Sequence, residues 1–374
     1  ECKNTFGKIR ERFKGIVDDL AIELDIDSYL DVVEKEMYKF NSAEFCASRG
    51  EYLSAVIIAK VLGYTFVDAK DIMLFTENGE FDAERTNELV ASTLANIQTA
   101  VVPGFYGGDE SGIVHTFSRG GSDVSGAVIA RAVGASLYEN WTDVNGFMSA
   151  DPRIVEEPKP IAKLSYKELR ELAYMGANVL HPESIFPVRV SNIHINIRNT
   201  FCPSADGTMI VSELNEQELS ERVITGIAGK KGYSIVYIEK SMMNSELGFV
   251  RKVLAVLEYY NISFEHLPTG IDTMSIIIPD SELAGKEEVV VERIKKVEDP
   301  DHIEIKSGIS LIATVGHGMS YKPGSASTLI GALAKEKINI RMIDQGSSEM
   351  NIIVGIATSD YERAIRAIYK AFQN

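Results

Sequence analysis

A glycine-rich turn before a small-residue helix is the feature of this sequence that most clearly suggests chemistry. The turn reads SRGGSD at residues 118–123, and the apolar segment VSGAVIARAVGA follows it directly. Two glycines at a helix start let backbone N–H groups approach an anion, and the helix dipole adds about half a positive charge there. Arg119 supplies a cation and Asp123 a polar anchor. The pattern predicts a phosphate site, with an ordinary helix cap as the alternative.

Four other short motifs surround this turn in the chain. SRGE lies upstream at residues 48–51, and WTDVNG, ADPR and GANVLHP lie downstream at residues 141–146, 150–153 and 176–182. In this order, and together with the turn, the motifs closely resemble the aspartokinases. These are enzymes of the amino-acid-kinase fold that phosphorylate the side-chain carboxylate of aspartate. The resemblance extends through nearly the whole chain and implies ATP as co-substrate.

The reaction that this resemblance implies needs positioning more than proton transfer. A side-chain carboxylate is already ionised at pH 7 and can attack without a general base. Catalysis then consists of holding two anions together and neutralising charge on the transferred phosphoryl group. The expected parts are guanidinium groups, backbone N–H donors and Mg²⁺ bound mainly by phosphates and water, with no metal site made by the protein alone. The product is 4-phospho-L-aspartate, at the start of lysine, threonine and methionine biosynthesis.

The resemblance assigns the aspartate site to the turn and to SRGE. Arg119 has a planar fork that matches a carboxylate, and Asp123 completes the site, so these two are the predicted catalytic residues. Glu51 is expected to receive the α-ammonium group of the substrate. The alternatives are a solvated arginine, a helix-start aspartate, and a glutamate that complements the dipole of the helix after it. Backbone N–H groups that face carboxylate or phosphate are expected from Gly120, Gly121 and Ser122.

The same resemblance places nucleotide contacts farther along the chain. Thr142 and Asp143 follow a strand end and are expected to contact ATP, with a simple turn before Gly146 as the alternative. Arg153 matches an arginine that contacts phosphate in the family, and a surface arginine in a turn is the alternative.

Two positions depart from the family pattern at the nucleotide site. Met148 stands where relatives often carry a tyrosine, and Asn178 stands where several carry a lysine that reaches ATP. Asn178 can therefore only hydrogen-bond the ligand, while Val179 can still offer backbone contacts. His181 is expected to be structural, because this chemistry needs no imidazole.

Another departure concerns the first strand of the family. Aspartokinases begin with a strand and loop of the type KFGGS that hold the ATP phosphates, whereas this sequence starts at Glu1, ahead of a helix, without that segment. We expect a truncated form, and we expect these 374 residues alone to be inactive or nearly so. The alternative is a chain that cannot phosphorylate, such as a non-catalytic amino-acid sensor.

The elements that position these motifs alternate between helices and short strands. Apolar residues recur at helical spacing, and a buried strand ends in glycines, as at the ligand-binding edge of open α/β folds. The expected fold is an α/β sandwich around a mainly parallel sheet, of the amino-acid-kinase type by resemblance. Helices are expected at residues 8–24, 31–40, 52–62, 83–98, 126–133 and 165–175, and strands at 65–68, 100–104, 137–141 and 195–199.

An internal repeat begins after about residue 221. NIS at residues 261–263, followed by MSIII, recurs as NIR at residues 339–341, followed by MNIIV. Each copy lies between two helices, so the unit is strand–helix–strand–strand–helix–strand, a ferredoxin-like module. The pair resembles ACT domains, which are small effector-binding modules. We predict a catalytic domain at residues 1–221 and ACT modules at 222–307 and 308–374, with the strand at 222–230 supplying the strand that the second module lacks.

The resemblance also implies that a feedback amino acid binds at the first module. Backbone groups of a strand and a helix start hold its α-carboxylate, and an acidic residue with nearby hydroxyls holds its ammonium group. That acidic residue is Glu265, where relatives mostly carry aspartate. Lysine is the preferred effector, with threonine or both as alternatives, and plain packing of polar loops is the competing interpretation. The expected contacts are Met243, Ser245, Gly248, Phe249, Ser263, Phe264, Glu265 and Thr269.

Composition and charge exclude several classes of partner. With 374 residues the chain exceeds one ordinary core, and its apolar fraction of 45% is that of a globular protein. The net charge of −16 argues against nucleic acid and anionic membrane as partners. No segment has the pattern of a membrane span or a secretory signal, and the three scattered cysteines fit a reducing cytoplasm.

Assembly and competing functions are also constrained. A homodimer formed through the ACT modules is expected, with a tetramer as the alternative, because such strands commonly pair across a two-fold axis. No fused homoserine dehydrogenase is expected, since no G-x-G-x-x-G fingerprint opens a βαβ unit. Besides the sensor, a kinase of the same fold acting on glutamate or UMP competes with aspartate phosphorylation. The doubled module together with SRGE disfavours that kinase.

Overall fold

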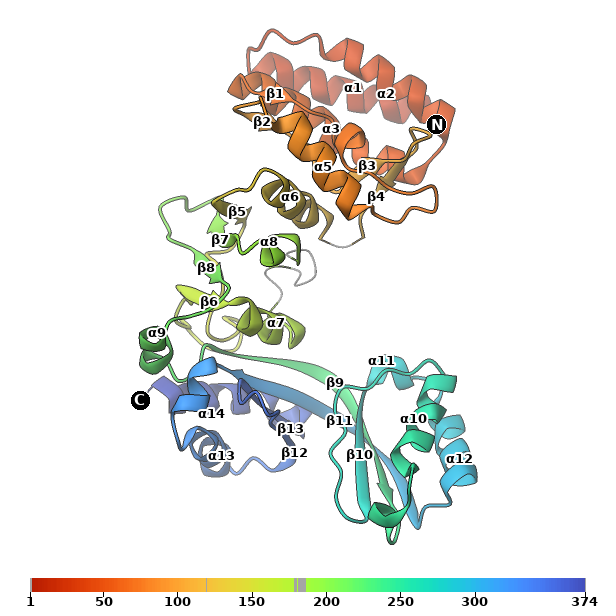
Figure 1. Cartoon of the computed structure of the whole chain (residues 1–374), viewed down its shortest axis with the longest axis vertical. Coiled ribbons are helices and arrows are strands. Elements are labelled where there is room, and N and C mark those ends of the chain that lie inside the picture. Colours follow the sequence, from red (N-terminus) through yellow and green to blue (C-terminus); the bar gives the residue numbers. More distant parts are fainter. Residues whose placement is uncertain (1, 119, 178–179, 181–185, 374) are drawn as a thin grey trace. The chain divides into compact units, whose positions relative to one another are not determined.

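The computed structural model describes residues 2–118, 120–177, 180 and 186–373 (Figure 1). Contacts group the chain into two compact units, which are Glu1–Thr142 with Leu180–Arg198 and Asp143–Val179 with Asn199–Asn374. These units do not coincide with the expected domain boundaries near residues 221 and 307, which remain predictions about sequence modules. Among the described residues, no helix combines the length and apolarity needed to cross a membrane.

Three long helices open the first unit: α1 (Cys2–Asp19), α2 (Ile26–Phe40) and α3 (Ala43–Leu62). The start of α3 is set by a side-chain cap, since the Ser42 hydroxyl accepts a hydrogen bond from the backbone N–H of Phe45 at 3.3 Å. Apolar side chains at helical spacing face one another and leave the charged faces outside. The core that the three helices share contains Phe6, Val17, Ile26, Leu30, Val33, Leu53 and Ile57.

The start of α3 corrects the sequence analysis. The sequence predicts a helix from residue 52, but α3 begins at Ala43, so SRGE lies inside the helix and not before it. The alternative role of Glu51 in the first turn of a helix is therefore wrong, because that turn carries Glu44 instead. Gly50 lowers the helix propensity of this stretch, while the burial of Phe45 and Leu53 on either side of it stabilises the longer helix.

Short strands and helices complete the first unit around a second core. β1 and β2 are parallel, whereas β3 and β4 form an antiparallel hairpin that leads toward α6. Phe45, Met73, Val90, Tyr106 and Val128 are among the buried side chains of this core. The elements are β1 (Thr65–Phe66), α4 (Ala69–Ile72), α5 (Ala83–Leu94), β2 (Ala100–Val101), β3 (Tyr106–Gly108), β4 (Val114–Thr116), α6 (Gly121–Ala132), β5 (Leu137–Thr142), α8 (Phe186–Val190) and β7 (His194–Asn199).

The second unit contains two short parallel strands and a helix that follows the first of them. β6 (Lys163–Ser165) and β8 (Thr208–Val211) pair in parallel, and α7 (Tyr166–Tyr174) follows β6 directly. α7 starts with a capping box, in which the side chains of Ser165 and Glu168 each accept from the other's backbone N–H. A second capping box starts α9 (Glu216–Glu221).

A five-stranded antiparallel sheet forms the rest of the second unit, in the order β10-β9-β11-β13-β12. Helices pack against it at both ends. Its elements are β9 (Gly226–Glu239), η1 (Met243–Ser245), α10 (Phe249–Tyr259), β10 (Thr273–Pro279), α11 (Asp280–Leu283), α12 (Glu287–Glu298), β11 (His302–Val315), η2 (His317–Tyr321), α13 (Ser325–Lys335), β12 (Ile340–Asp344), β13 (Asn351–Ala357), η3 (Thr358–Asp360) and α14 (Tyr361–Gln373).

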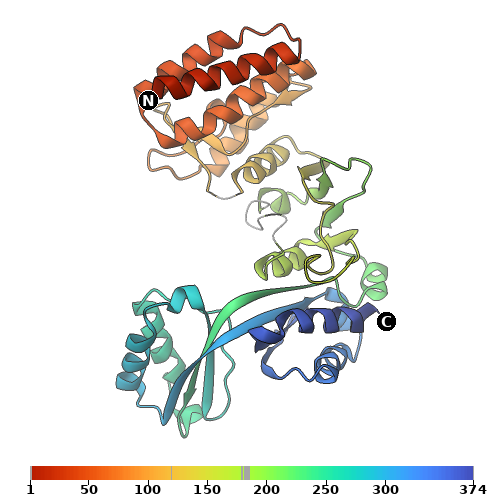
Figure 2. The same cartoon turned by 180° about the vertical axis from the view of Figure 1, so that it is seen from behind.

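β9 and β11 are long enough for two pairs of helices to pack along them, as Figure 1 and Figure 2 show from opposite sides. Residues 226–231 of β9 pair with residues 310–315 of β11, which also pairs with β13; α13 and α14 share this core. Residues 233–239 pair with β10 and with residues 302–309 of β11; α10 and α12 share that core. We call residues 233–309 the first repeat, and residues 226–231 with 310–373 the second repeat.

The expected α/β class is confirmed. An α-helix overlaps each expected helical range before residue 221, and a short strand overlaps each expected strand. β1–β2 and β6–β8 pair in parallel in this part of the chain, and the five-stranded sheet after it is antiparallel.

Candidate functional site

The glycine-rich turn forms the start of α6. Gly120 precedes the helix with φ +73°, a left-handed conformation that favours glycine. A Cβ on Gly121 would lie 2.8 Å from the Cβ atoms of Phe105 and Phe117, so only glycine fits between these rings. The N-cap residue Gly120 has no side chain that could accept a hydrogen bond from the first N–H groups of α6. This geometry suits an anion, while Arg119 itself lies outside the described residues.

The loop between β2 and β3 holds this helix start in place. The Ser125 hydroxyl donates to the carbonyl oxygen of Gly121 at 3.1 Å and accepts from the backbone N–H of Phe105 at 3.0 Å. A Cβ on Gly104 would lie 3.1 Å from the hydroxyl oxygen of Ser122, so the loop runs close to the first turn of α6. The backbone donors are therefore positioned before any ligand arrives, as electrostatic stabilisation requires.

Asp123, in the first turn of α6, is held by a neighbour that the sequence analysis missed. The side-chain amide of Asn140 on β5 donates to Asp123 Oδ1 at 2.8 Å. The Tyr138 hydroxyl lies 3.4 Å from the carbonyl oxygen of Asp123. Burial raises the pKa of Tyr138 to about 12, so this hydroxyl stays protonated at neutral pH. The position of Asn140, directly before the WTDVNG motif, is the only signal in the sequence that could have indicated this role.

α3 brings SRGE to the same hairpin. Glu44 Oε1 accepts from the N–H and from the hydroxyl of Thr116, both at 3.0 Å, which ties α3 to β4. Glu51 lies about two turns farther along the same helix face and is exposed. Among the described residues, no hydrogen bond or ion pair engages the Glu51 carboxylate, which suits it to receive a cationic group. Arg49 is buried instead, with its guanidinium carbon 4.6 to 4.8 Å from the ring centroids of Phe45, Tyr52 and Tyr106.

The predicted nucleotide residues fall on both compact units. Thr142 ends β5 in the first unit and is half-buried. Asp143 is exposed in the second unit, where Met148 is half-buried and forms an isolated β-bridge with Pro160. Asn178 and Val179, like His181, lie outside the described residues. The role of these residues in nucleotide binding stays a prediction.

Arg153 is engaged within its own turn. Its Nε and Nη2 atoms donate to the two carboxylate oxygens of Asp151 at 3.0 and 2.7 Å. The guanidinium holds the pKa of Asp151 below its usual value. The Arg153 side chain is otherwise 86% exposed. A phosphate bound by Arg153 would have to compete with this bidentate pair, which the sequence analysis did not foresee.

Comparison with known proteins places these features in a family. Residues 5–199 match the amino acid kinase family, and residues 312–372 match an ACT domain. Aspartokinase 3 of Bacillus subtilis is 36% identical over 366 residues, which cover 96% of this chain and 78% of that protein. The chain belongs to the aspartokinase family. The family resemblance drawn from the motifs is thus confirmed.

Solved aspartokinase structures agree with this assignment. Clostridium acetobutylicum aspartate kinase, described as an allosteric enzyme, is 51% identical with a TM-score of 0.92, over 99% of this chain and 85% of that one. Escherichia coli aspartokinase III shares the fold at 23% identity, in a complex with aspartate and ADP (TM-score 0.71, 98% and 88% covered) and in one with lysine and aspartate (0.70, 98% and 87%). The chain spans 38% of the length of the bifunctional plant aspartokinase/homoserine dehydrogenases that it matches. Aspartate kinase under allosteric control is accordingly the enzyme class of this chain.

The expected effector residues of this aspartokinase-family chain lie on three segments of the first repeat. Met243 in η1 and Phe249 in α10 are buried and belong to the core of the repeat. Gly248 starts α10 with φ +83° and without a side-chain cap, while Ser245 is exposed before it. The third segment holds Glu265, which is half-buried, together with the exposed residues Ser263, Phe264 and Thr269.

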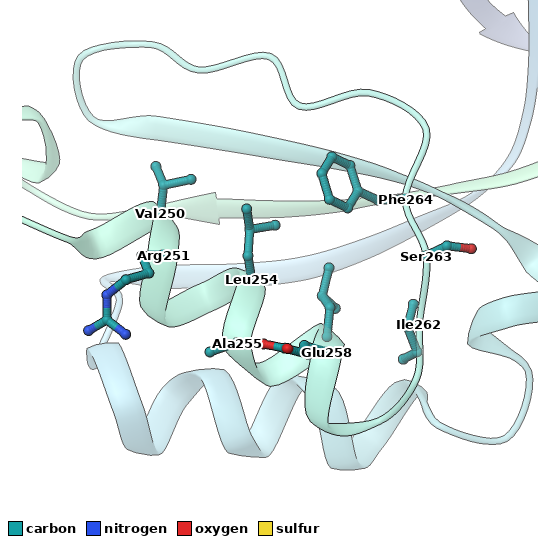
Figure 3. Close-up of a pocket in the computed structure, with 9 residues that line it drawn as sticks. Val250, Arg251, Leu254, Ala255, Glu258, Ile262, Ser263 and Phe264 are labelled. Carbon is teal, nitrogen blue, oxygen red and sulfur yellow. The ribbon is translucent and has the colours of Figure 1, made fainter.

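A groove of about 800 Å³ lies between α10 and residues 262–264 (Figure 3). Figure 3 shows Val250 and Leu254 projecting from α10 on the side of the Phe264 ring. Of the expected effector residues, only Ser263 and Phe264 line this groove. Because most of the lining is apolar, the groove resembles a protein-binding surface beside the predicted amino-acid site more than that site itself.

Four charged side chains hold the loop that leads to α10. Lys240 and Lys252 each contact the carboxylates of Glu246 and Glu298 at 2.5 to 3.2 Å. Glu298 is 3% exposed, whereas Glu246 belongs to the loop itself. Hydrogen bonds from the two lysines lower the pKa of Glu246 to about 2. The sequence analysis missed this cluster, since nothing local links its members.

Proposed function

We propose that this chain transfers the γ-phosphoryl group of ATP to the side-chain carboxylate of L-aspartate, giving 4-phospho-L-aspartate at the start of lysine, threonine and methionine biosynthesis. The observation that carries the proposal is the start of α6, where the left-handed Gly120 and the tightly packed Gly121 begin the helix without a side-chain cap at Gly120. A chain with a net charge of −16 has to build an anion site from local dipoles and few cations.

Each residue of the aspartate site would perform one task. The N–H groups at the start of α6 would bind a carboxylate or phosphate, and Arg119 would pair with a carboxylate of the substrate through its planar fork. Asp123, held by Asn140, would complete the substrate site, and Glu51 would bind the α-ammonium group. The substrate carboxylate attacks in its ionised form, so the protein's part is orientation and charge neutralisation.

ATP would bind as the second substrate. Mg²⁺ would neutralise charge on the transferred group and would be held mostly by phosphate oxygens and water, as is usual for this ion. The exposed carboxylate of Asp143 offers one hard oxygen ligand. Among the described residues, no three His, Cys, Asp or Glu side chains are grouped so that they could hold a metal. The nucleotide contacts that we propose are Thr142, Asp143, Met148, Arg153, Asn178 and Val179.

An amino acid, lysine in the first instance, would bind the first repeat and inhibit the enzyme, with threonine or both as alternatives. The uncapped start of α10 at Gly248 suits an α-carboxylate, and Glu265 suits an ammonium group. The lysine complex of Escherichia coli aspartokinase III, a protein of the same fold, supports lysine as the first ligand to test.

The first repeat also supports the expected homodimer, with a tetramer as the alternative. Several large apolar side chains of this repeat are 40 to 96% exposed, and a contact between two copies of the chain would cover apolar surface of this kind. A reducing cytoplasm remains the proposed location. The exposed side chains are Met242, Leu247, Tyr259, Phe264 and Ile271.

The catalytic proposal is tested with Arg119→Ala and Glu51→Gln in the full-length protein, with Glu88→Gln, an exposed glutamate on α5, as the matched control. We expect each site variant to lower kcat/KM for acyl-phosphate formation from aspartate and ATP by at least about 100-fold, because an oriented charge contact is lost. The control should stay within about twofold. Circular dichroism checks that all three variants fold.

Near-normal turnover in both site variants would show that the aspartate site has been misplaced. A full-length protein that binds lysine but neither binds nor turns over ATP would instead favour the amino-acid sensor.

A further inference from the structure

Three side chains of α7 contact the five-stranded sheet or the segments that join its strands; we call this sheet the regulatory sheet. Residues three apart lie on the same side of a helix, and Glu168, Glu171 and Tyr174 have this spacing. Each of them contacts a different part of the chain. Because α7 leads into Asn178 and Val179, which are proposed nucleotide contacts, these three contacts connect the regulatory sheet to the segment before the nucleotide site.

The first two contacts are fixed parts of the fold. Glu168 is 1% exposed, and its Oε1 accepts from the hydroxyl of Thr225 at 2.5 Å and from the backbone N–H of His317 at 3.2 Å. Glu171 Oε2 accepts from the side-chain amide of Asn351, on β13, at 2.6 Å. A buried carboxylate with several donors is costly to release, so these contacts attach α7 to the second repeat.

The third contact differs because it is accessible. The Tyr174 hydroxyl donates to Glu265 Oε2 at 2.5 Å, and Tyr174 is 54% exposed. Lys230 on β9 lies 4.9 Å from the centroid of the Tyr174 ring. Burial, together with the nearby Glu265, raises the pKa of Tyr174 to about 12, so at neutral pH the phenol is the donor and Glu265 the acceptor.

We propose that the ammonium group of a bound amino-acid effector displaces the Tyr174 hydroxyl from Glu265, and that α7 transmits this loss of contact toward the nucleotide segment. The inference rests on the proposed role of Glu265 in effector binding. An ammonium–carboxylate bond is charge-assisted on both sides and roughly twice as strong as a neutral hydrogen bond, so it can replace the phenol. The other two contacts keep α7 on the second repeat while its last turn is released.

Linkage gives this exchange a measurable consequence. If the Tyr174–Glu265 bond stabilises only the ligand-free state, its removal has to favour effector binding by the same factor. Tyr174→Phe removes the hydroxyl and keeps the ring beside Lys230. The variant should therefore bind the effector more tightly, and α7 should already be in its released state without ligand.

The experiment measures binding of lysine, and separately of threonine, by isothermal titration calorimetry, together with hydrogen exchange of peptides that cover residues 166–177. Tyr259→Phe is the matched control, since Tyr259 is 75% exposed and its hydroxyl makes no hydrogen bond among the described residues. We expect Tyr174→Phe to bind the active ligand about three- to tenfold more tightly, from the usual worth of a bond to a charged group. Its ligand-free exchange at the end of α7 should match that of the ligand-bound wild type.

Glu265→Gln separates this inference from the proposed effector site. The amide oxygen can still accept from Tyr174, but the charge that binds an ammonium group is gone, so we expect affinity to fall by more than about tenfold. If this variant loses affinity while Tyr174→Phe matches the wild type in affinity and exchange, the displacement is wrong and the effector site stands. If the wild type binds neither ligand, or Glu265→Gln binds normally, the effector site and the displacement both fail.

Discussion

The two repeats of the five-stranded sheet both run from a strand through a loop into a helix, but they hold these corresponding loops in different ways. Among the described residues, only the second repeat has the two strands, β12 and β13, that the sequence predicts between the helices; in the first repeat β10 is preceded by isolated bridges at His266 and Thr269. In the first repeat, residues 240–248 join β9 to α10, and in the second, residues 316–324 join β11 to α13. Both helices start without a side-chain cap at a glycine in the left-handed region, Gly248 at φ +83° and Gly324 at φ +96°. Equivalent positions in the two loops can therefore be compared directly.

The loop of the first repeat is anchored inside its own repeat. Lys240 and Lys252 bind both Glu246 of the loop and the buried Glu298 at the end of α12. Beyond this anchor the loop is open: Leu247 is 96% exposed, and the nearest atom to a Cβ on Gly248 would be 3.9 Å away. An anchored but uncovered helix start can accept a ligand.

The loop of the second repeat is anchored on a different part of the chain. The backbone N–H of His317 donates to Glu168 on α7. A Cβ on Gly316 would lie 2.5 Å from the Cα atom of Ile224, and one on Gly318 would overlap the carbonyl oxygen of Arg222. One copy of a duplicated loop thus remains open for a ligand, while the other attaches the sheet to α7 and to the chain before β9.

The largest expected effect on stability comes from adding a side chain where the loop of the second repeat is tightly packed. Gly318→Ala places a Cβ against the backbone oxygens of Arg222 and Leu219, which cannot move aside like a side chain, so we expect the free energy of unfolding to fall by about 3 kcal/mol. Gly248→Ala in the open loop should cost only about 1 kcal/mol, from its left-handed backbone. Urea unfolding followed by circular dichroism measures both. Equal costs would mean that the second loop is no more tightly packed than the first.

A smaller effect is expected from the anchor of the open loop. Glu298→Gln removes a buried charge from between Lys240 and Lys252 and should destabilise the protein by about 2 kcal/mol, less than for a fully buried pair because both lysines are partly exposed. The control is Glu292→Gln on α12, whose ion pair with Lys295 is exposed and should be worth under about 0.5 kcal/mol. The same urea unfolding measures both variants. An equal cost for the two would show that the buried anchor does not stabilise the loop.

The sequence predicts local structure in this chain better than contacts between distant segments. Periodicity indicates the helices α10 and α13, and the glycines before them mark their starts, because both signals are local. The early start of α3 is missed because Gly50 weakens a helix that Phe45 and Leu53 stabilise by packing elsewhere. The close approach of Gly318 to Arg222 depends on how β9 and β11 pair, which no local pattern states.

The same distinction between local structure and distant contacts applies to the candidate site. The turn at Gly120 and Gly121 can be predicted, since a left-handed glycine and an uncapped helix are written in the local sequence. The partner of Asp123, Asn140, could not be predicted, because it comes from a different strand. The capping box of Ser165 and the buried Glu168 can be recognised in the sequence. The sequence does not reveal that Thr225 and His317 donate to the same carboxylate. Arg119 and the nucleotide residues stay predictions.

The smallest expected effect is the loss, at low pH, of the ion pairs that anchor the open loop. Lys240 and Lys252 lower the pKa of Glu246 from 4.5 to about 2. A carboxylate whose pKa is lower in the folded state stabilises that state fully above its unfolded pKa, and this stabilisation is lost as the pH falls from about 4.5 toward 2. The ¹³C chemical shift of the Glu246 carboxyl, assigned by comparison with Glu246→Gln, should therefore titrate with a midpoint near 2 and not near 4.5. Lys252→Met should move its midpoint back toward 4.5. A wild-type midpoint already near 4.5 would mean that the two lysines do not hold Glu246. The loop of the first repeat would then lack its anchor, and it would differ even more from the attached loop of the second repeat.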